Sequence, residues 1–188
     1  LVRDDLLIEI QTRGFSAMKR KLATLLEHHP IQVVHPIAVE KWIVKLDDEG
    51  REVSRRKSPK RGSRLDLFPE LVSFPQLVAH PNLTVEVLLT HEQEVRRFDK
   101  ERAWRRRGWV IEERRLIEVV DWQLIESPAD LVAWLPPDLP REFTTADLAV
   151  ELGRTRGLAQ QMAYCLRHAG AIEPVGKRAN TIVYARVG

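Results

Sequence analysis

The first twelve residues combine the apolar pattern of a strand with polar side chains at alternate positions. Leu7, Ile8 and Ile10 form a short apolar run, and Asp4 and Asp5 stand before it where a turn is expected. This pattern predicts a pair of strands joined at the two aspartates. Because neighbouring side chains of a strand point to opposite faces, Ile8 and Ile10 are expected together on a buried face.

From residue 16 the period of the apolar positions changes to that of a helix. Ser16 is a candidate N-cap, and Pro30 follows the point where the helical pattern ends. Residues 31–37 and 40–46 then predict two buried strands, and a turn leads to a return strand at 51–53. The order of strand, helix and strands indicates a mixed α/β layer. The apolar face of the predicted helix consists of Met18, Leu22, Leu25 and Leu26.

Residues 51–64 are half lysine and arginine, with Gly, Pro and Ser among them and almost nothing to bury. This composition predicts a mobile basic loop. Two short helical turns broken by Pro69 and Pro75 follow, and then a strand at 83–89. A second basic stretch becomes strand-like from Trp109.

The composition changes again near Ser127, where we place a domain boundary. Ser127 and Pro128 have the character of N-cap and first residue of a short helix. Thr145 is expected to cap a second helix that ends at Gly153, and another helix follows until Gly170. Two strands then enclose residues 176–180. The expected buried positions of the two longer helices are Leu148, Leu152, Leu158, Met162, Cys165 and Leu166.

Helix, turn, helix and hairpin over residues 143–187 resemble a winged helix-turn-helix. The resemblance implies that the second helix enters the major groove of DNA and that the hairpin tip contacts phosphates. Arginine and glutamine can pair bidentately with guanine and adenine edges, and lysine suits phosphates. Winged helices also serve as protein-interaction modules, which is the alternative. The residues that would contact nucleic acid are Arg154, Arg156, Gln160, Gln161 and Tyr164 on the helix, with Lys177 and Arg178 at the hairpin tip.

The overall composition admits one ordinary domain and a small one. The chain has 188 residues, of which 44% are hydrophobic and 30% charged, with a net charge of +3. Its single cysteine, Cys165, excludes an internal disulfide framework and a cysteine-rich zinc site, and fits a reducing, cytoplasmic setting. No apolar run is long enough to span a membrane. Because Leu1 falls at the edge of a strand pattern, we expect further residues upstream of it.

Glu9 and Gln11 raise the question of what polar side chains do on one face of a core strand. A carboxylate there suits a hard cation such as Mg²⁺ or Mn²⁺, and the carbonyl oxygen of Ile10 can add a second ligand. The helix that follows carries Lys19 and Lys21, which would draw a phosphate chain toward the metal. Solvent exposure of a plain strand face is the alternative. The candidate catalytic residues are Glu9, Gln11, Lys19 and Lys21, and the candidate metal ligands are Glu9 and Ile10.

A glutamate, an apolar residue and a glutamine at a strand end, followed by a helix, resemble the core of the PD-(D/E)xK nuclease superfamily. The resemblance implies a mixed sheet flanked by helices, with Mg²⁺ activating a water at a phosphodiester. Gln11 then stands where the family has lysine, so that water activation would rest on the metal. The family's aspartate is not found before Glu9, since Asp5 fits a turn, and it is expected upstream of Leu1.

These patterns together predict an α/β protein with a mixed-sheet, nuclease-like domain at 1–126 and a winged helix-turn-helix at 127–188. The expected function is binding or Mg²⁺-dependent cleavage of DNA in repair or defence. A non-enzymatic DNA-binding regulator and a protein–protein adaptor are the alternatives. Trp104 and Trp109 flank the second basic stretch and serve either base stacking or packing. Further candidate nucleic-acid contacts are Arg55, Arg56, Lys57, Lys60, Arg61, Arg105, Arg106 and Arg107.

Overall fold

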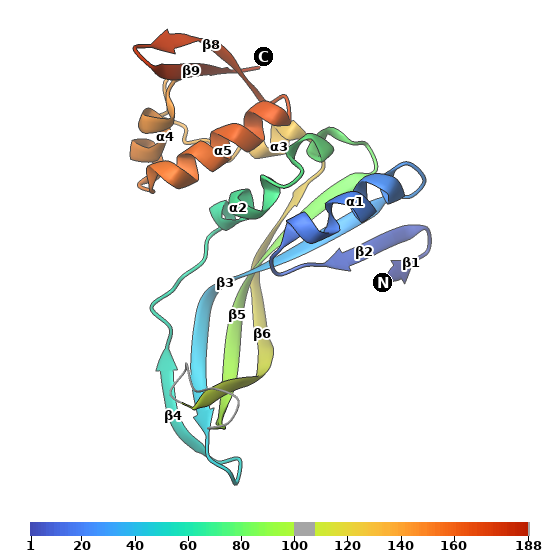
Figure 1. Ribbon diagram of the computed structural model, residues 1–188, viewed down its shortest axis with the longest axis vertical. Coiled ribbons are helices and arrows are strands. Elements are labelled where there is room, and N and C mark those ends of the chain that lie inside the picture. The colour runs from blue at the N-terminus through green and yellow to red at the C-terminus, as the bar shows by residue number, and fades with distance from the viewer. Residues whose placement is uncertain (100–107, 188) are drawn as a thin grey trace. The chain divides into compact units, whose positions relative to one another are not determined.

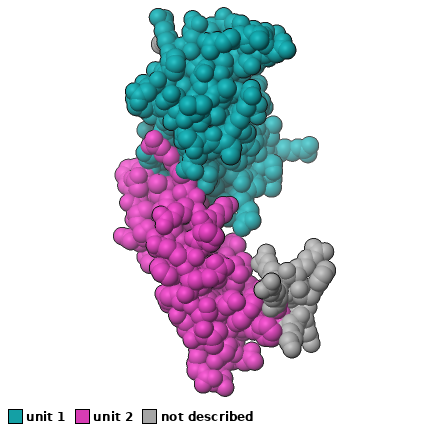
Figure 2. All heavy atoms as spheres, turned by 90° about the vertical axis from the view of Figure 1, so that its left-hand side faces the viewer, with its two compact units in different colours: residues 1–35, 65–87, 123–188 teal, residues 36–64, 88–122 magenta. Residues whose placement is uncertain are grey.

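A computed structural model describes residues 1–99 and 108–187 of the chain. By its internal contacts the chain forms two compact units, which Figure 2 shows in different colours. Unit 1 comprises Leu1–His35, Leu65–Val87 and Gln123–Gly188. Unit 2 comprises Pro36–Arg64 and Leu88–Trp122. No helix of the described ranges has the length and apolar character needed to cross a membrane.

The larger sheet is mixed, which confirms the α/β class. Its strands follow the order β1-β2-β3-β5-β6, and β4 pairs with β3 outside this path (Figure 1). Strands β1 and β2 are antiparallel, β2 and β3 are parallel, and β3 and β4 are antiparallel. The strands are β1 (Val2–Arg3), β2 (Leu6–Ile10), β3 (Ile31–Leu46), β4 (Glu52–Lys57), β5 (Leu83–Phe98) and β6 (Trp109–Ile125).

Strands β1 and β2 form the hairpin that the sequence predicts, with Asp4 in the left-handed conformation at its turn. The prediction that this strand is buried is wrong at its end. Ile10 is 57% exposed, and Leu7 and Ile8 are only partly covered. An apolar run shows that a residue fits a strand, but its burial depends on which other elements pack over it.

Helix α1 (Phe15–Leu26) connects β2 to β3 and begins one residue before the predicted N-cap. Gly14 is the N-cap, in a left-handed conformation with φ of 76°, and Ser16 makes no cap. The carboxylate of Glu70 accepts hydrogen bonds from the backbone N–H groups of Gly14 and Phe15, at 2.7 and 3.1 Å. A carboxylate from a distant segment therefore takes the place of a local cap.

The core of unit 1 is built on the apolar face of α1. Met18, Leu22 and Leu26 are buried as predicted. Phe15 stacks on Phe74 with ring centroids 5.4 Å apart. Phe74 directly precedes the third of three short helical elements in this region, which are η1 (Arg64–Leu67), α2 (Phe68–Leu71) and η2 (Pro75–Ala79).

Residues 31–62 depart from the predicted elements in two ways. Residues 31–46 form one strand where the pattern predicted two, and residues 52–57 form β4 where it predicted a mobile loop. Beyond β4 the N–H groups of Ser58 and Gly62 still donate to the carbonyls of Lys41 and Ala38. A Cβ on Gly62 would lie 2.8 Å from the Ala38 carbonyl oxygen, so glycine permits this close approach.

The C-terminal part has the predicted order of elements. Ser127 caps α3 in a capping box with Asp130, and Gly153 ends α4 in the left-handed conformation. The cap of α4 is Thr144, one residue earlier than predicted, because its hydroxyl reaches the N–H groups of Ala146 and Asp147. Strands β7, β9 and β8 form a second sheet in this order. The elements are α3 (Pro128–Val132), β7 (Glu142–Phe143), α4 (Thr145–Leu152), α5 (Arg156–His168), β8 (Ile172–Arg178) and β9 (Thr181–Arg186).

Helix α5 lies at the centre of this part and contacts α2, η2, α3, α4 and β8. Its buried stripe consists of Ala159, Met162, Ala163, Cys165 and Leu166. By contacts these residues belong to the same unit as α1. The boundary near residue 127 stays a prediction.

Candidate functional site

Glu9 and Lys21 form the polar contact between β2 and α1. The alternation of side chains along β2 turns Glu9 toward the helix. Its Oε2 lies 3.4 Å from Nζ of Lys21, and the two side chains are 38% and 64% exposed. An ion pair this exposed adds little to stability. The carboxylate and the ammonium group are therefore accessible to a ligand.

A cavity of about 190 Å³ lies beside this pair within unit 1. Its walls are mainly apolar and come from β1, β2, α1 and the start of β3. The remaining lining residues include Leu1, Val2, Leu7, Met18, Leu22 and Leu25. An uncharged, apolar group fits this cavity better than a phosphate does.

The other two predicted catalytic residues do not join Glu9. Lys19 is two positions before Lys21, hence about 200° away around the helix, on a different face. The side-chain amide of Gln11 donates to the carbonyl of Arg13. The structure therefore brings together Glu9 and Lys21 from the predicted set of four.

The predicted metal site is incomplete in the described residues. They contain no group of three His, Cys, Asp or Glu side chains that could hold a metal ion. Glu9 is one carboxylate, and Lys21 already stands beside it at 3.4 Å. Mg²⁺ in proteins is usually bound through one or two carboxylates together with waters and substrate phosphates. Glu9 could supply one such carboxylate, and the metal site stays a prediction.

His35 is a buried polar residue beside this region that the sequence analysis did not single out. Its side chain is 3% exposed, and its Nδ1 lies 2.7 Å from the carbonyl oxygen of Gln11. Burial lowers the pKa of His35, while the Gln11 carbonyl and the carboxylates of Glu70 and Asp66 act in the opposite direction. The sequence feature that could have identified His35 is its position as a histidine within the apolar run of residues 31–37.

A second candidate surface lies on α5. Thr155 caps the helix by accepting a hydrogen bond from the N–H of Leu158 at 3.3 Å. Arg156, Gln160 and Tyr164 follow at intervals of four residues and are exposed. Four-residue spacing places them along one stripe of the helix, opposite the buried one. Three of the five contact residues predicted for this helix thus share a solvent-facing stripe, whereas Arg154 precedes α5 and Gln161 is half-buried.

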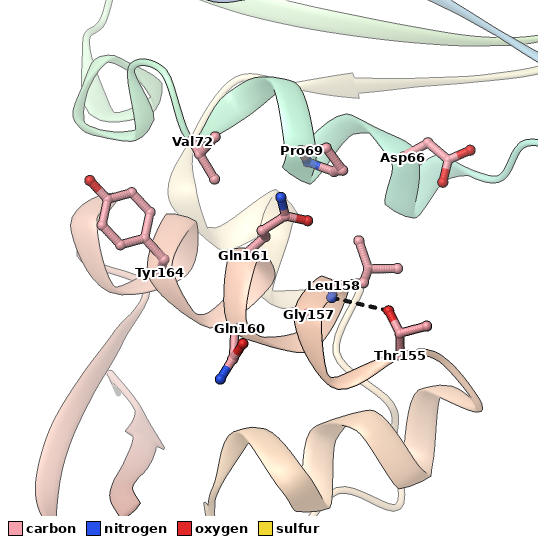
Figure 3. Close-up of a pocket in the computed structure, with 9 residues that line it drawn as sticks. All are labelled: Asp66, Pro69, Val72, Thr155, Gly157, Leu158, Gln160, Gln161 and Tyr164. Carbon is pink, nitrogen blue, oxygen red and sulfur yellow. Dashed lines mark hydrogen bonds between the residues drawn. The ribbon is translucent and has the colours of Figure 1, made fainter.

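A hollow of about 970 Å³ borders this stripe (Figure 3). Gln160, Gln161 and Tyr164 line it from α5, and Asp66, Pro69 and Val72 line it from η1, α2 and the residue after α2. The ring of Tyr164 also lies 4.3 Å from that of His168. Amide, phenol and apolar groups here offer hydrogen bonds and a flat surface to a planar ligand.

The tip of the β8–β9 hairpin carries the two predicted basic residues. Lys177 and Arg178 end β8 and are exposed, and Ala179 turns the chain with φ of 52°. A guanidinium nitrogen of Arg178 lies 3.7 Å from Asp147, which closes the cap of α4. The hairpin tip therefore lies near the start of α4.

The first basic segment is matched by carboxylates over much of its length. Arg55 binds Glu52 within β4, with 2.8 Å between the closest atoms. Lys57 binds Glu40 at 2.6 Å and lies over the ring of Trp42. Where a mobile loop was expected, backbone pairing with β3 forms a strand, and these contacts lie at its surface. Exposed side chains for which no ion pair is found within the described ranges are Arg56, Lys60 and Arg61.

Trp109 has a packing role in unit 2. Its ring contacts that of Phe98 at 5.4 Å, and Nζ of Lys45 lies 4.2 Å above it. This favours the packing alternative for Trp109 over base stacking. The predicted contacts Arg105, Arg106 and Arg107, and also Trp104, lie outside the described residues.

Comparisons with known proteins give a family and a relative. The family model described as Domain of unknown function (DUF8091) matches residues 1–126. An uncharacterized protein of Treponema pallidum (strain Nichols) is 29% identical over 186 residues, which is 97% of this chain and 72% of that protein. No solved structure matches. Because the similarity extends beyond residue 126, both proteins contain the C-terminal part as well.

Proposed function

Because the chain belongs to the DUF8091 family, whose description names no activity, we propose from the geometry that it binds duplex nucleic acid through its C-terminal part. The observation that carries this proposal is the exposed stripe Arg156, Gln160 and Tyr164 on α5. In this proposal α4, α5 and the β8–β9 hairpin act as a winged helix-turn-helix. Cys165, single and buried, fits the cytoplasmic setting that the proposal includes.

The amphipathic character of α5 supports base contact by its exposed stripe. The buried stripe attaches the helix to unit 1, so the opposite stripe can enter a major groove without loss of core contacts. Gln160 offers both a donor and an acceptor, which suits adenine, and Arg156 suits guanine. Arg154 precedes the helix, where a phosphate would also meet the positive end of the helix dipole.

The hairpin supports the proposal through charge. Lys177 and Arg178 stand at its tip, and Arg178 has a partner only at 3.7 Å, which a phosphate can replace. In unit 2, Arg56, Lys60 and Arg61 are further exposed cations. Such groups bind phosphates in a way that weakens with salt.

We expect measurable affinity for duplex DNA that falls steeply as salt increases. Fluorescence anisotropy at several salt concentrations measures the affinity and its salt slope. Arg156→Ala and Gln160→Ala should lower the affinity for a selected sequence more than for random DNA. Lys177→Ala should lower both equally and reduce the salt slope by about one.

Arg141→Ala is the matched control, since Arg141 is exposed in the same part of the chain but outside α5 and the hairpin. It should leave the binding of the selected sequence unchanged. Equal effects of Arg141→Ala and Arg156→Ala, or an affinity independent of salt, would contradict the proposal.

Phosphodiester cleavage is the second candidate function, and the Glu9–Lys21 contact favours it. In this proposal Lys21 supplies the positive charge that Gln11 lacks at the position where the nuclease superfamily has lysine. Its ammonium group would bind the phosphate, and the Glu9 carboxylate would accept a proton from the attacking water. The order of β2, α1 and the parallel strand β3 supports the likeness.

A nuclease assay on single-stranded, duplex and branched DNA, with Mg²⁺ or Mn²⁺ present, tests this function. Glu9→Gln and Lys21→Met should each lower the rate by about 100-fold or more if both groups act on the reaction. Lys19→Met removes the same charge from a different face of α1 and should leave the rate unchanged. Cleavage that survives Glu9→Gln would show that another site acts.

A further inference from the structure

The outer strand β6 exposes an unusually apolar run for the edge of a sheet. It is the last strand in the sheet order, so its outer backbone groups have no strand partner among the described residues. Exposed edges invite pairing with another strand, and proteins usually protect them with charge or a covering element. The exposed fractions are 61% for Leu116, 58% for Ile117, 42% for Val119, 41% for Val120 and 59% for Trp122.

Side-chain contacts to β5 establish the direction of β6 and its faces. His91 lies 3.4 Å from Glu118, and Arg97 lies 3.0 Å from Glu112. The contacts move toward higher residue numbers on β5 and toward lower residue numbers on β6, so the two strands are antiparallel. Even-numbered side chains of β6 lie on the face of Glu118, and odd-numbered ones lie on the opposite face.

We propose that a second copy of this chain pairs with β6, antiparallel, around a two-fold axis at Glu118. A two-fold axis perpendicular to the sheet keeps each face on its own side. Directly opposed residues must then both be even-numbered or both be odd-numbered. With the axis at Glu118, Leu116 faces Val120 of the other copy, and Ile117 faces Val119.

Charges also match in this register. Arg115 faces Asp121 of the other copy, and by symmetry the pair occurs twice. Arg114 faces Trp122, a suitable contact for a guanidinium group. The two Glu118 side chains approach each other at the axis, which opposes pairing in this register. Each of them also lies 3.4 Å from His91 of its own chain. Directly opposed side chains on two neighbouring strands, such as Arg115 and Asp121 here, are the pairs that stabilise a sheet.

Neighbouring registers are worse. An axis at Ile117 places Glu113 against Asp121, so that like charges meet. An axis at Val119 places Ile117 against Asp121 and Glu118 against Val120, so that apolar groups face carboxylates. Of these three registers, the one with its axis at Glu118 matches best, and this self-complementarity favours a copy of this chain as the partner.

Sedimentation velocity over a range of concentrations tests the assembly. We expect a monomer–dimer equilibrium in the wild-type chain. Arg115→Asp and Asp121→Arg should each raise the dimer dissociation constant about tenfold or more, because like charges then meet twice. The double variant exchanges the two charges and should return the constant close to the wild-type value.

Val53→Lys is the matched control, because Val53 is 56% exposed on β4 of the same unit. It should leave the equilibrium unchanged, whereas Ile117→Lys should abolish the dimer. A chain that is monomeric at its highest soluble concentration would overturn the proposal. So would a dimer that is indifferent to Ile117→Lys and the two charge reversals.

Oxidative cross-linking tests the register. Glu118→Cys places two thiols at the axis, with Cβ atoms about 5 Å apart across the pair. Covalent dimer should form readily, and background should be low because Cys165 is buried. Arg56→Cys on β4 should form no covalent dimer. If both variants cross-link equally, the assembly does not use this register.

Discussion

His35 is an ionisable residue buried in the interior of unit 1. Its ring packs edge-on against Phe15 at 5.0 Å and is hydrogen-bonded to the Gln11 carbonyl. Burial lowers its pKa, so the folded protein resists the proton that the unfolded chain accepts. The neutral ring links the end of β2 to β3, next to the start of α1.

This burial predicts a loss of stability in mild acid. The unfolded chain begins to bind the additional proton below about pH 6.5, whereas folded His35 does so only at lower pH. The free energy of unfolding should therefore decrease as pH falls from about 6.5 toward the lowered pKa. Urea denaturation at a series of pH values measures it.

His35→Gln should flatten this pH dependence, because glutamine does not titrate in this range. His28→Gln is the control, since the His28 side chain is 73% exposed. A dependence that His28→Gln changes as much as His35→Gln would assign the effect to histidines in general.

At the scale of elements, the contact of α5 with α2 holds the C-terminal part in unit 1. Phe68 on α2 is fully buried, and its ring lies 5.9 Å from that of Trp134. The thiol of Cys165 on α5 donates to the Phe68 carbonyl oxygen at 3.7 Å, and burial raises its pKa to about 12. Apolar packing thus fixes the helix whose opposite stripe is proposed to contact DNA.

Phe68→Ala should lower the free energy of unfolding by about 3–5 kcal/mol, because it removes a buried ring from a packed interior. Val150→Ala is the control on α4, where Val150 is 76% exposed, and it should change stability by no more than about 0.5 kcal/mol. Urea denaturation followed by tryptophan fluorescence measures both. A loss below about 1 kcal/mol for Phe68→Ala would show that α2 does not hold this part.

At the scale of the whole molecule, the proposed functions use different units and can be tested separately. The stripe on α5 and the Glu9–Lys21 pair belong to unit 1, and the apolar run of β6 belongs to unit 2. Ile117→Lys should abolish the dimer without changing how steeply the DNA affinity of each monomer falls with salt. Lys177→Ala should reduce that salt slope without altering the dimer. The two results distinguish failure of assembly from failure of nucleic-acid binding.

Much of the fold was predictable where neighbouring residues determine the local structure. The turn at Asp4, the buried face of α1 and the cap at Ser127 follow from spacing and side-chain chemistry within a few residues. The order of α4, α5 and the hairpin was predictable for the same reason. Of the candidate catalytic residues, Glu9 and Lys21 were named by the sequence and are in contact.

The continuous strand β3 shows where local reasoning fails. The sequence predicted strands at 31–37 and 40–46, but the structure has one strand that also contains Pro36, a residue without an N–H group to donate. The backbone of Pro36 faces the same edge of β3 as that of Val34, two residues earlier. The carbonyl of Val34 accepts a hydrogen bond from the N–H of Gln11, the last bond from the β2 side. Since β2 ends there and β4 pairs only from Trp42, no ladder bond needs the missing N–H.

The sequence by itself determined the order of most helices and strands and the ends at Ser127 and Gly153, because periodicity and capping act over one or two turns of chain. Only the tertiary structure decided which distant groups meet. It supplied Glu70 as the cap of α1, Glu40 as the partner of Lys57, and the Gln11 carbonyl as the partner of His35. It also left Ile10 exposed and turned a basic loop into β4. Burial and charge pairing depend on what packs across the space between elements, and no local pattern contains that information.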